Sequence, residues 1–180
     1  MTEAPDFLKE NYIKWGREFE EKKLGFHKHL KYQAIRIELE NMTNNHCSFC
    51  DSYPLFGKAN RTVEHFRPKS RFPLLAFVWH NLFLCCMTCQ KARGAKYDKK
   101  LLKPDRDDYS FSRYFTFNSK EGTIDINKNA SPQDQERANL TLETYDLNNK
   151  GWQIVRLKEI EAFRSNNYQI RDLSFRFIFE

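Results

Sequence analysis

The chain has 180 residues, of which 40% are hydrophobic and 30% are charged, and it contains only 6 glycines. This composition is that of a soluble globular protein of one domain, with or without a helical extension, and it excludes long low-complexity linkers. The formal net charge of +6 is unevenly distributed, because residues 57–103 hold eleven Lys and Arg but only two acids. That segment carries +9 and the remainder sums to −3, which is typical of a phosphate-binding surface.

The uncharged stretch 72–90 has almost the length of a membrane span. It contains Pro73, His80, Asn81 and three cysteines, so we interpret it as a buried strand and turn and predict no membrane association. Residues 1–10 lack the apolar segment of a signal peptide. Together with cysteines arranged for metal binding, this predicts a cytoplasmic protein with thiolates and no disulfides.

Residues 1–44 predict an N-terminal helical extension. Apolar residues recur at helical spacing over residues 8–19, and a second amphipathic helix is expected at 27–42, ended by Asn44 and Asn45. One stripe of the first helix contains Leu8, Tyr12, Trp15 and Phe19, and the inward-facing positions expected in the second helix are Leu30, Ala34, Ile35, Leu39 and Met42.

We predict that residues 45–104 form the core of the domain. Residues 61–66 have the composition of a short strand that Pro68 ends, 72–84 could hold a second strand or a buried turn, and 86–96 are expected to enter a helix. We therefore expect an α+β fold in which two strands and a helix lie between the N-terminal helices and the segment that follows.

Residues 105–180 complete what we expect to be a single domain. A β-hairpin is predicted at 114–126, and Ser131 with Pro132 is a typical helix start. A last helix is expected at 153–175. The apolar end of the chain, 175–180, must dock on this domain or on a partner, unless the natural chain extends past Glu180.

Four of the five cysteines form two CxxC pairs, separated by 35 residues. Two such pairs supply four thiolates, enough for a tetrahedral structural zinc site with no open position. Buried free cysteines and a redox CxxC are the alternatives, but two correctly spaced pairs without a thioredoxin-like pattern favour zinc. Only Cys86, and not its neighbour Cys85, preserves the CxxC spacing. The predicted zinc ligands are Cys47, Cys50, Cys86 and Cys89.

Between the two pairs, His65 follows Glu64 at the end of the predicted strand and precedes basic residues. Asn81 and Gln90 come later, the latter just after the second CxxC. A lone histidine is more often structural than catalytic. A general base, an orienting amide and metal-binding oxygens on a basic surface are nevertheless the groups that metal-assisted phosphodiester hydrolysis needs.

These motifs resemble those of the HNH (ββα-metal) endonucleases. Residues 63–70 read VEHFRPKS, residues 79–82 read WHNL, and CxxC pairs flank both. This combination is similar to the PtuB-type HNH nucleases, which accompany a PtuA-like ATPase in bacterial Septu and some retron anti-phage systems. The resemblance covers about residues 47–97 and extends more weakly to about 157.

The resemblance implies a ββα-metal (HNH) core and a role for each motif residue. His65 would be the general base, and Glu64 would help to hold a catalytic Mg²⁺ or Mn²⁺. Asn81 would fix the turn and orient the imidazole. Gln90 stands where the family usually has Asn or His, and its longer side chain could weaken the metal site or abolish activity.

The expected substrate is DNA of phage or plasmid, with RNA an open alternative, bound without sequence specificity through phosphate contacts. A different hypothesis is a zinc-stabilised nucleic-acid-binding or docking subunit without cleavage activity, which the departure at Gln90 keeps open. The predicted phosphate-contacting residues are Arg67, Lys69, Arg71, Lys91, Arg93 and Lys96.

Overall fold

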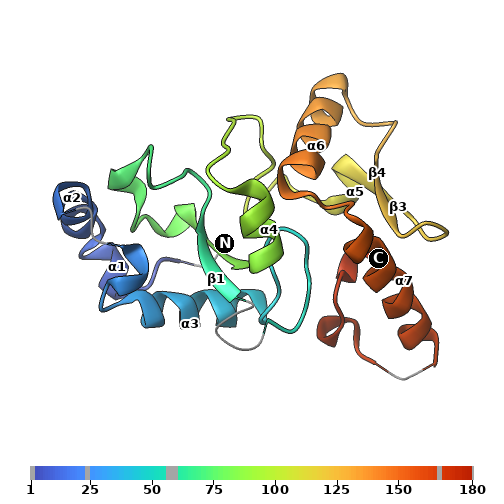
Figure 1. Cartoon of the computed structure of the whole chain (residues 1–180), viewed down its shortest axis with the longest axis horizontal. Coiled ribbons are helices and arrows are strands. Elements are labelled where there is room, and N and C mark those ends of the chain that lie inside the picture. The colour runs from blue at the N-terminus through green and yellow to red at the C-terminus, as the bar shows by residue number, and fades with distance from the viewer. Residues whose placement is uncertain (1–2, 23–24, 56–60, 166–167, 180) are drawn as a thin grey trace.

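The computed structural model describes residues 3–22, 25–55, 61–165 and 168–179. Helices and two small two-stranded sheets alternate along the chain, so the predicted α+β class is confirmed. Figure 1 places β1 and α4 between the N-terminal helices on one side and the C-terminal hairpin and helices on the other. The helices and strands are α1 (Asp6–Lys9), α2 (Tyr12–Lys22), α3 (Tyr32–Thr43), β1 (Arg61–His65), β2 (Leu82–Cys86), α4 (Met87–Arg93), α5 (Phe111–Tyr114), β3 (Phe115–Asn118), β4 (Thr123–Ile126), α6 (Pro132–Tyr145) and α7 (Lys150–Ser165).

The centre of the fold is a ββα unit made of β1, β2 and α4. β1 and β2 are antiparallel, and the register pairs Val63 with Leu84 and His65 with Leu82. All of β2 is buried, as expected for a strand with five apolar residues in succession. α4 begins directly after β2, with the sulfur of Cys86 capping its first turn by accepting a hydrogen bond from the Cys89 N–H.

The N-terminal segment is helical, as predicted, but its details differ. The first stripe is divided between α1 and α2, and the second helix starts only at Tyr32, after a 3₁₀ turn η1 (Phe26–Lys28). The expectation that Leu30 faces inward is wrong, because Leu30 lies in the turn between η1 and α3 and is 96% exposed. Ile35 and Leu39 are buried as expected.

α2 packs closely on η2 (Pro73–Leu75), part of the connection between β1 and β2. A Cβ atom built on Gly16 of α2 would lie 2.8 Å from the Leu74 carbonyl oxygen. Glycine is therefore required here for the helix to approach the connection. This contact fixes α2 beside the loop that follows His65.

The C-terminal part contains the predicted hairpin as β3 and β4, and Ser131 caps α6 by accepting a hydrogen bond from the Asp134 N–H. The predicted last helix is too long, since α7 ends at Ser165. The described residues beyond it form short 3₁₀ turns, η4 (Ile170–Asp172) and η5 (Arg176–Ile178), because they pack against the first CxxC loop and do not continue the helix.

The described part of the apolar end docks on this domain, one of the alternatives that the sequence left open. The Phe175 N–H donates to the Asp51 carbonyl at 2.9 Å, and Arg176 pairs with the Asp51 carboxylate at 2.5 Å. Nε2 of His46 lies 3.0 Å from the Leu173 carbonyl. The chain end thus supports the loop that carries Cys47 and Cys50.

Candidate metal centre and catalytic pocket

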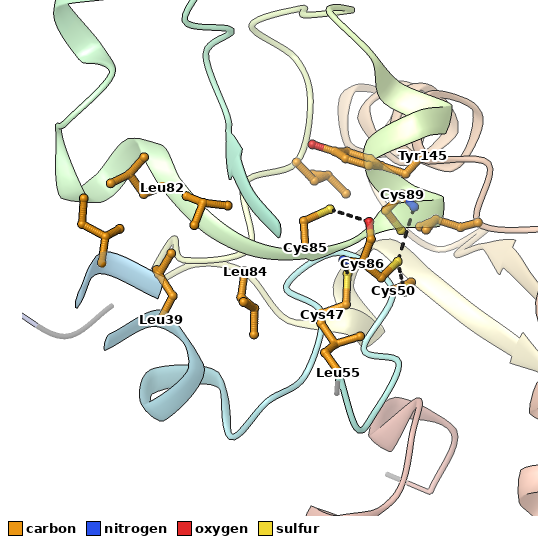
Figure 2. Close-up of a cluster of buried hydrophobic side chains, with 14 of the residues drawn as sticks. Leu39, Cys47, Cys50, Leu55, Leu82, Leu84, Cys85, Cys86, Cys89 and Tyr145 are labelled. Atoms are coloured by element: carbon orange, nitrogen blue, oxygen red, sulfur yellow. Dashed lines mark hydrogen bonds between the residues drawn. The ribbon is translucent and has the colours of Figure 1, made fainter. Parts of the chain in front are cut away.

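The four predicted zinc ligands meet in the interior. The sulfur atoms of Cys47, Cys50, Cys86 and Cys89 all lie within 4.8 Å of one another, and all four residues are buried. Figure 2 shows that the first pair comes from a loop and the second from the end of β2 and the start of α4. The sulfurs of Cys50 and Cys86 are 3.7 Å apart, close to the edge of about 3.8 Å that a tetrahedron with Zn–S bonds of about 2.3 Å requires.

Backbone hydrogen bonds support thiolates at this centre. The Cys86 N–H donates to Cys47 Sγ at 3.3 Å, and the Cys89 N–H donates to Cys86 Sγ at 3.3 Å. Cys85 lies outside the four-sulfur group, and its thiol donates to the Cys86 carbonyl at 3.3 Å (Figure 2). This separation follows from strand geometry, since consecutive residues point to opposite faces. The cluster can therefore hold a metal ion such as zinc.

A buried cation lies near the cluster. Arg156 of α7 is 0% exposed and donates to the carbonyls of Leu147 (2.6 Å) and Gly122 (3.1 Å). No carboxylate of the described residues forms an ion pair with it. Burial lowers the pKa of Arg156 to about 10, and the charges of Cys50 and Cys89 act in the opposite direction. A four-thiolate zinc centre carries two negative charges, so it would compensate this buried guanidinium.

His65 lies at the end of β1 and is 2% exposed. Its Nε2 is 3.1 Å from the carbonyl oxygen of Ala76, and because a carbonyl can only accept, Nε2 must carry the proton. Nδ1 is then the unprotonated nitrogen, the atom that a general base needs. Phe26 packs edge-on against the imidazole with the ring centroids 4.5 Å apart.

Burial is the largest of the causes that lower the pKa of His65 to about 3, and the positive charges of Lys69 and Arg93 add to it. The imidazole is therefore neutral at physiological pH. Since the folded state binds this proton less well than the unfolded chain does, acid should destabilise the protein as pH falls from about 6.5 toward 3.

Between pH 7 and pH 5.5, we expect the free energy of unfolding to fall by about 1 kcal/mol because of His65 alone. Urea denaturation of the protein and of His65→Gln at both pH values measures this. The variant should lose that part of the pH dependence, and an equal loss of stability in both proteins would contradict the assignment.

Glu64 is buried beside His65 and is held by several partners. Its Oε1 accepts a hydrogen bond from the His65 N–H at 3.1 Å and pairs with the guanidinium of Arg93. Burial raises the pKa of Glu64, whereas Arg93 and a hydrogen bond from Gln90 oppose that rise. Gln90 also donates from Nε2 to Thr62 Oγ1 at 3.1 Å, so its amide oxygen is the atom that could coordinate an ion.

Glu64, His65 and Gln90 line one pocket of about 620 Å³. The remaining wall residues come from three segments, namely α2 with Gly25, the loop after β1, and the C-terminal end of α4. They are Phe19, Glu20, Gly25, Pro68, Lys69, Ser70, Pro73, Gly94 and Ala95. A carboxylate with a few further oxygens suits Mg²⁺, which commonly takes one or two protein carboxylates together with substrate phosphates.

Asn81 does not line this pocket, and it fixes the turn. Its Oδ1 accepts from the Arg67 N–H at 2.7 Å, and its Nδ2 donates to the carbonyls of Arg67 (3.1 Å) and Leu75 (3.0 Å). The imidazole of His65 is held by Ala76, next to Leu75, so Asn81 can orient it only through the backbone.

Asn81→Ala should lower the free energy of unfolding by about 2–4 kcal/mol, because backbone groups in a buried turn lose their partners. Chemical denaturation measures the loss. Asn139→Ala, which removes an exposed side-chain hydrogen bond on α6, is a matched control and should change stability by less than about 0.5 kcal/mol. Equal effects of the two substitutions would contradict the structural role of Asn81.

The predicted cationic residues divide into two groups. Arg67, Arg71, Lys91 and Lys96 are exposed, and Lys69 lines the pocket. Arg93 is 0% exposed, pairs with Glu64 and donates to the His65 carbonyl at 2.8 Å. This placement does not fit the expected phosphate contact, so Arg93 is assigned to holding Glu64 and the strand end.

Some site residues could not be found from the sequence. Ala76 acts through its backbone carbonyl, for which side-chain patterns give no signal. Phe26 and Phe19 belong to the N-terminal segment, whose helical periodicity indicates packing and not a position beside His65. Arg156 lacks any motif, although a charged residue in the middle of an apolar helical stripe is a weak signal.

No protein-family model matches this chain. A curated relative does match: over 66 residues the chain is 35% identical to the Septu protein PtuB of Bacillus thuringiensis. This chain resembles PtuB. The predicted PtuB-like character is therefore confirmed over 37% of the chain, and the match spans 26% of the relative. In the described residues, no helix has both the length and the apolar character needed to cross a bilayer.

Proposed function

We propose that this PtuB-like chain is a metal-dependent HNH endonuclease that hydrolyses phosphodiester bonds. One observation carries the proposal: a neutral, oriented imidazole lies with Glu64 and Gln90 in one pocket, beside exposed basic residues. A base, metal-binding oxygens and phosphate-attracting charges are the components of metal-assisted hydrolysis.

His65 accepts the proton of the attacking water at Nδ1, while the Nε2–H remains bonded to the Ala76 carbonyl. That bond favours the imidazolium that forms, because it gains strength when the ring is charged. Before substrate binds, the low pKa keeps the ring unprotonated. An entering phosphate adds negative charge and raises that pKa, so basicity increases when the substrate is in place.

A divalent ion, Mg²⁺ or Mn²⁺, would be held by Glu64 and Gln90 and would stabilise the charge that develops on the phosphate. Lys69, which lines the same pocket, attracts the phosphate, and the exposed Arg67, Arg71, Lys91 and Lys96 attract the neighbouring phosphates. The four cysteines would hold a structural zinc that links the loop of Cys47 and Cys50 to the end of β2 and the start of α4.

The resemblance to PtuB also bears on the biological role of the chain. We infer that the chain is the effector subunit of an anti-phage defence complex and that it acts with a PtuA-like ATPase. The match to a Septu protein supports this inference.

The test is incubation of the zinc-loaded chain, alone and with the cognate ATPase, with plasmid DNA in Mg²⁺ or Mn²⁺. We expect nicked and linear products that require the divalent ion. Intact DNA under every condition would overturn the proposal.

A second candidate function is nucleic-acid binding without cleavage. The ion pair with Arg93 favours it, because it occupies the carboxylate of Glu64 that a catalytic ion needs. Titration with Mn²⁺, followed by electron paramagnetic resonance, separates the two functions. A nuclease should bind one Mn²⁺ that Glu64→Gln abolishes, whereas a binding module should bind none at this site.

A further inference from the structure

The pocket that contains His65 is bounded by α2 as well as by the ββα unit. Phe19 and Glu20 of α2, together with Gly25, form this wall, and the close contact of Gly16 with Leu74 fixes its distance. The imidazole itself is only 2% exposed. A phosphate must therefore enter this pocket to reach His65.

A double helix does not meet this requirement. Its paired, stacked bases make the duplex stiff and fix the path of its backbone, so bending one phosphate with its flanking sugars into a pocket costs free energy. An unpaired strand is flexible and can insert one phosphate with its flanking sugars into a pocket of about 620 Å³.

Beside the pocket lies a group of aromatic rings and arginines, which we name the aromatic platform: Phe72, Tyr97, Arg67 and Arg71. The rings of Phe72 and Tyr97 meet edge to face with centroids 5.5 Å apart. The guanidinium of Arg71 lies 5.7 Å from the centre of the Phe72 ring and 5.9 Å from that of Tyr97. Arg67 lies 5.9 Å from the Phe72 ring.

Both rings of the platform are only partly buried, and both arginines are exposed. The guanidinium groups lie over the rings, so charge and partly exposed ring surface are offered together. Such groups bind unpaired bases without regard to sequence, because every base has a π face and every nucleotide a phosphate. Paired bases in a duplex offer no such face, since their neighbours already cover it. The platform is thus suited to single strands.

One short loop connects the platform to the pocket. In residues 67–73, Pro68, Lys69, Ser70 and Pro73 line the pocket, while Arg71 and Phe72 of the same loop contact Tyr97. The Arg71 and Phe72 N–H groups both donate to the Pro68 carbonyl at 2.9 Å, and Asn81 holds Arg67 at the start of the loop. A strand stacked on the platform is therefore adjacent to the pocket.

We propose that the substrate of this site is an unpaired nucleic-acid strand, which stacks on the aromatic platform and inserts a phosphate into the His65 pocket. This rests on the proposed function and adds the substrate class to it. DNA and RNA single strands share the chemistry that the platform recognises.

Binding is measured on the full zinc-loaded chain carrying His65→Ala, so that cleavage does not interfere. Fluorescence anisotropy compares a labelled unpaired oligodeoxynucleotide, the same sequence as RNA, and the same DNA sequence in a hairpin duplex. We expect at least one unpaired strand to bind at least tenfold more tightly than the duplex. Phe72→Leu with Tyr97→Leu should weaken that binding by about 5- to 150-fold for each lost stack. Phe163→Leu on α7, which packs on Phe179, should not weaken it.

Crosslinking adds a readout that needs no platform variant. An unpaired strand containing bromouracil, irradiated on the same protein, should crosslink to peptides that contain Phe72 or Tyr97. The inference is overturned if the duplex binds as tightly as both unpaired strands, if the double variant keeps full affinity, or if the crosslinks map elsewhere.

Cleavage is scored in separate reactions with His65 intact. A chain that cleaves DNA but prefers the duplex would overturn this inference and leave the proposed function standing. A chain that binds unpaired strands through the platform but never cleaves them would support this inference and contradict the proposed function.

Discussion

Cys89→Ala should release the zinc and unfold much of the domain. Cys89 is buried and supplies one of four sulfurs that lie within 4.8 Å of one another. Structural zinc contributes on the order of 10 kcal/mol of folding free energy in small domains, and losing one of four ligands removes much of it. Elemental analysis of the purified variant should give less than one zinc per chain. Its thermal unfolding curve, monitored by circular dichroism, should show no cooperative transition.

Cys85→Ala is the matched control. Cys85 is equally buried and adjacent to a ligand, but its thiol only donates to the Cys86 carbonyl. We expect this variant to retain one zinc and to lose about 1–2 kcal/mol of stability through the small cavity and the lost hydrogen bond. A Cys89→Ala protein that keeps full zinc, or a Cys85→Ala protein that loses it, would contradict the ligand assignment.

The second large effect concerns cleavage. His65→Ala should reduce the rate of DNA hydrolysis by about 10²–10⁴-fold, the usual contribution of a general base. The rate is measured under single-turnover conditions in Mg²⁺, with zinc content and melting temperature recorded for each preparation. Added imidazole should restore part of the activity, because the substitution leaves space where the ring lay.

His80→Ala serves as the control for this experiment. Its side chain is 62% exposed and contacts Asp105, outside the pocket, so its removal should leave the rate within about twofold. A His65→Ala protein that cleaves as fast as the unsubstituted chain would remove His65 from the mechanism.

The order of elements in the core followed from local sequence signals. Two CxxC pairs predicted where the chain must converge, Pro68 indicated where β1 ends, and Ser131 with Pro132 indicated where α6 begins. These signals depend on nearest neighbours and on ligand chemistry, which the sequence displays directly. For example, the CxxC spacing alone predicted that Cys47 and Cys89 lie in one four-sulfur cluster.

The remaining features depend on tertiary contacts between distant residues. Leu30 has an apolar side chain at helical spacing, but the turn before α3 leaves it exposed. Arg93 lies in a basic segment, and its neighbours Lys91 and Lys96 are exposed. Its own side chain is buried because it forms an ion pair with the buried carboxylate of Glu64. The proximity of α2 to His65 depends on one glycine contact across 58 residues, which periodicity cannot indicate.

The central claim is that four sulfurs hold one zinc and thereby present the His65 imidazole beside Glu64 and Gln90. Zinc K-edge X-ray absorption on the purified chain tests it most directly. The account predicts one zinc per chain with four sulfur neighbours at about 2.3 Å. Nitrogen or oxygen atoms in the first coordination sphere, or a chain that purifies folded without a metal, would contradict it.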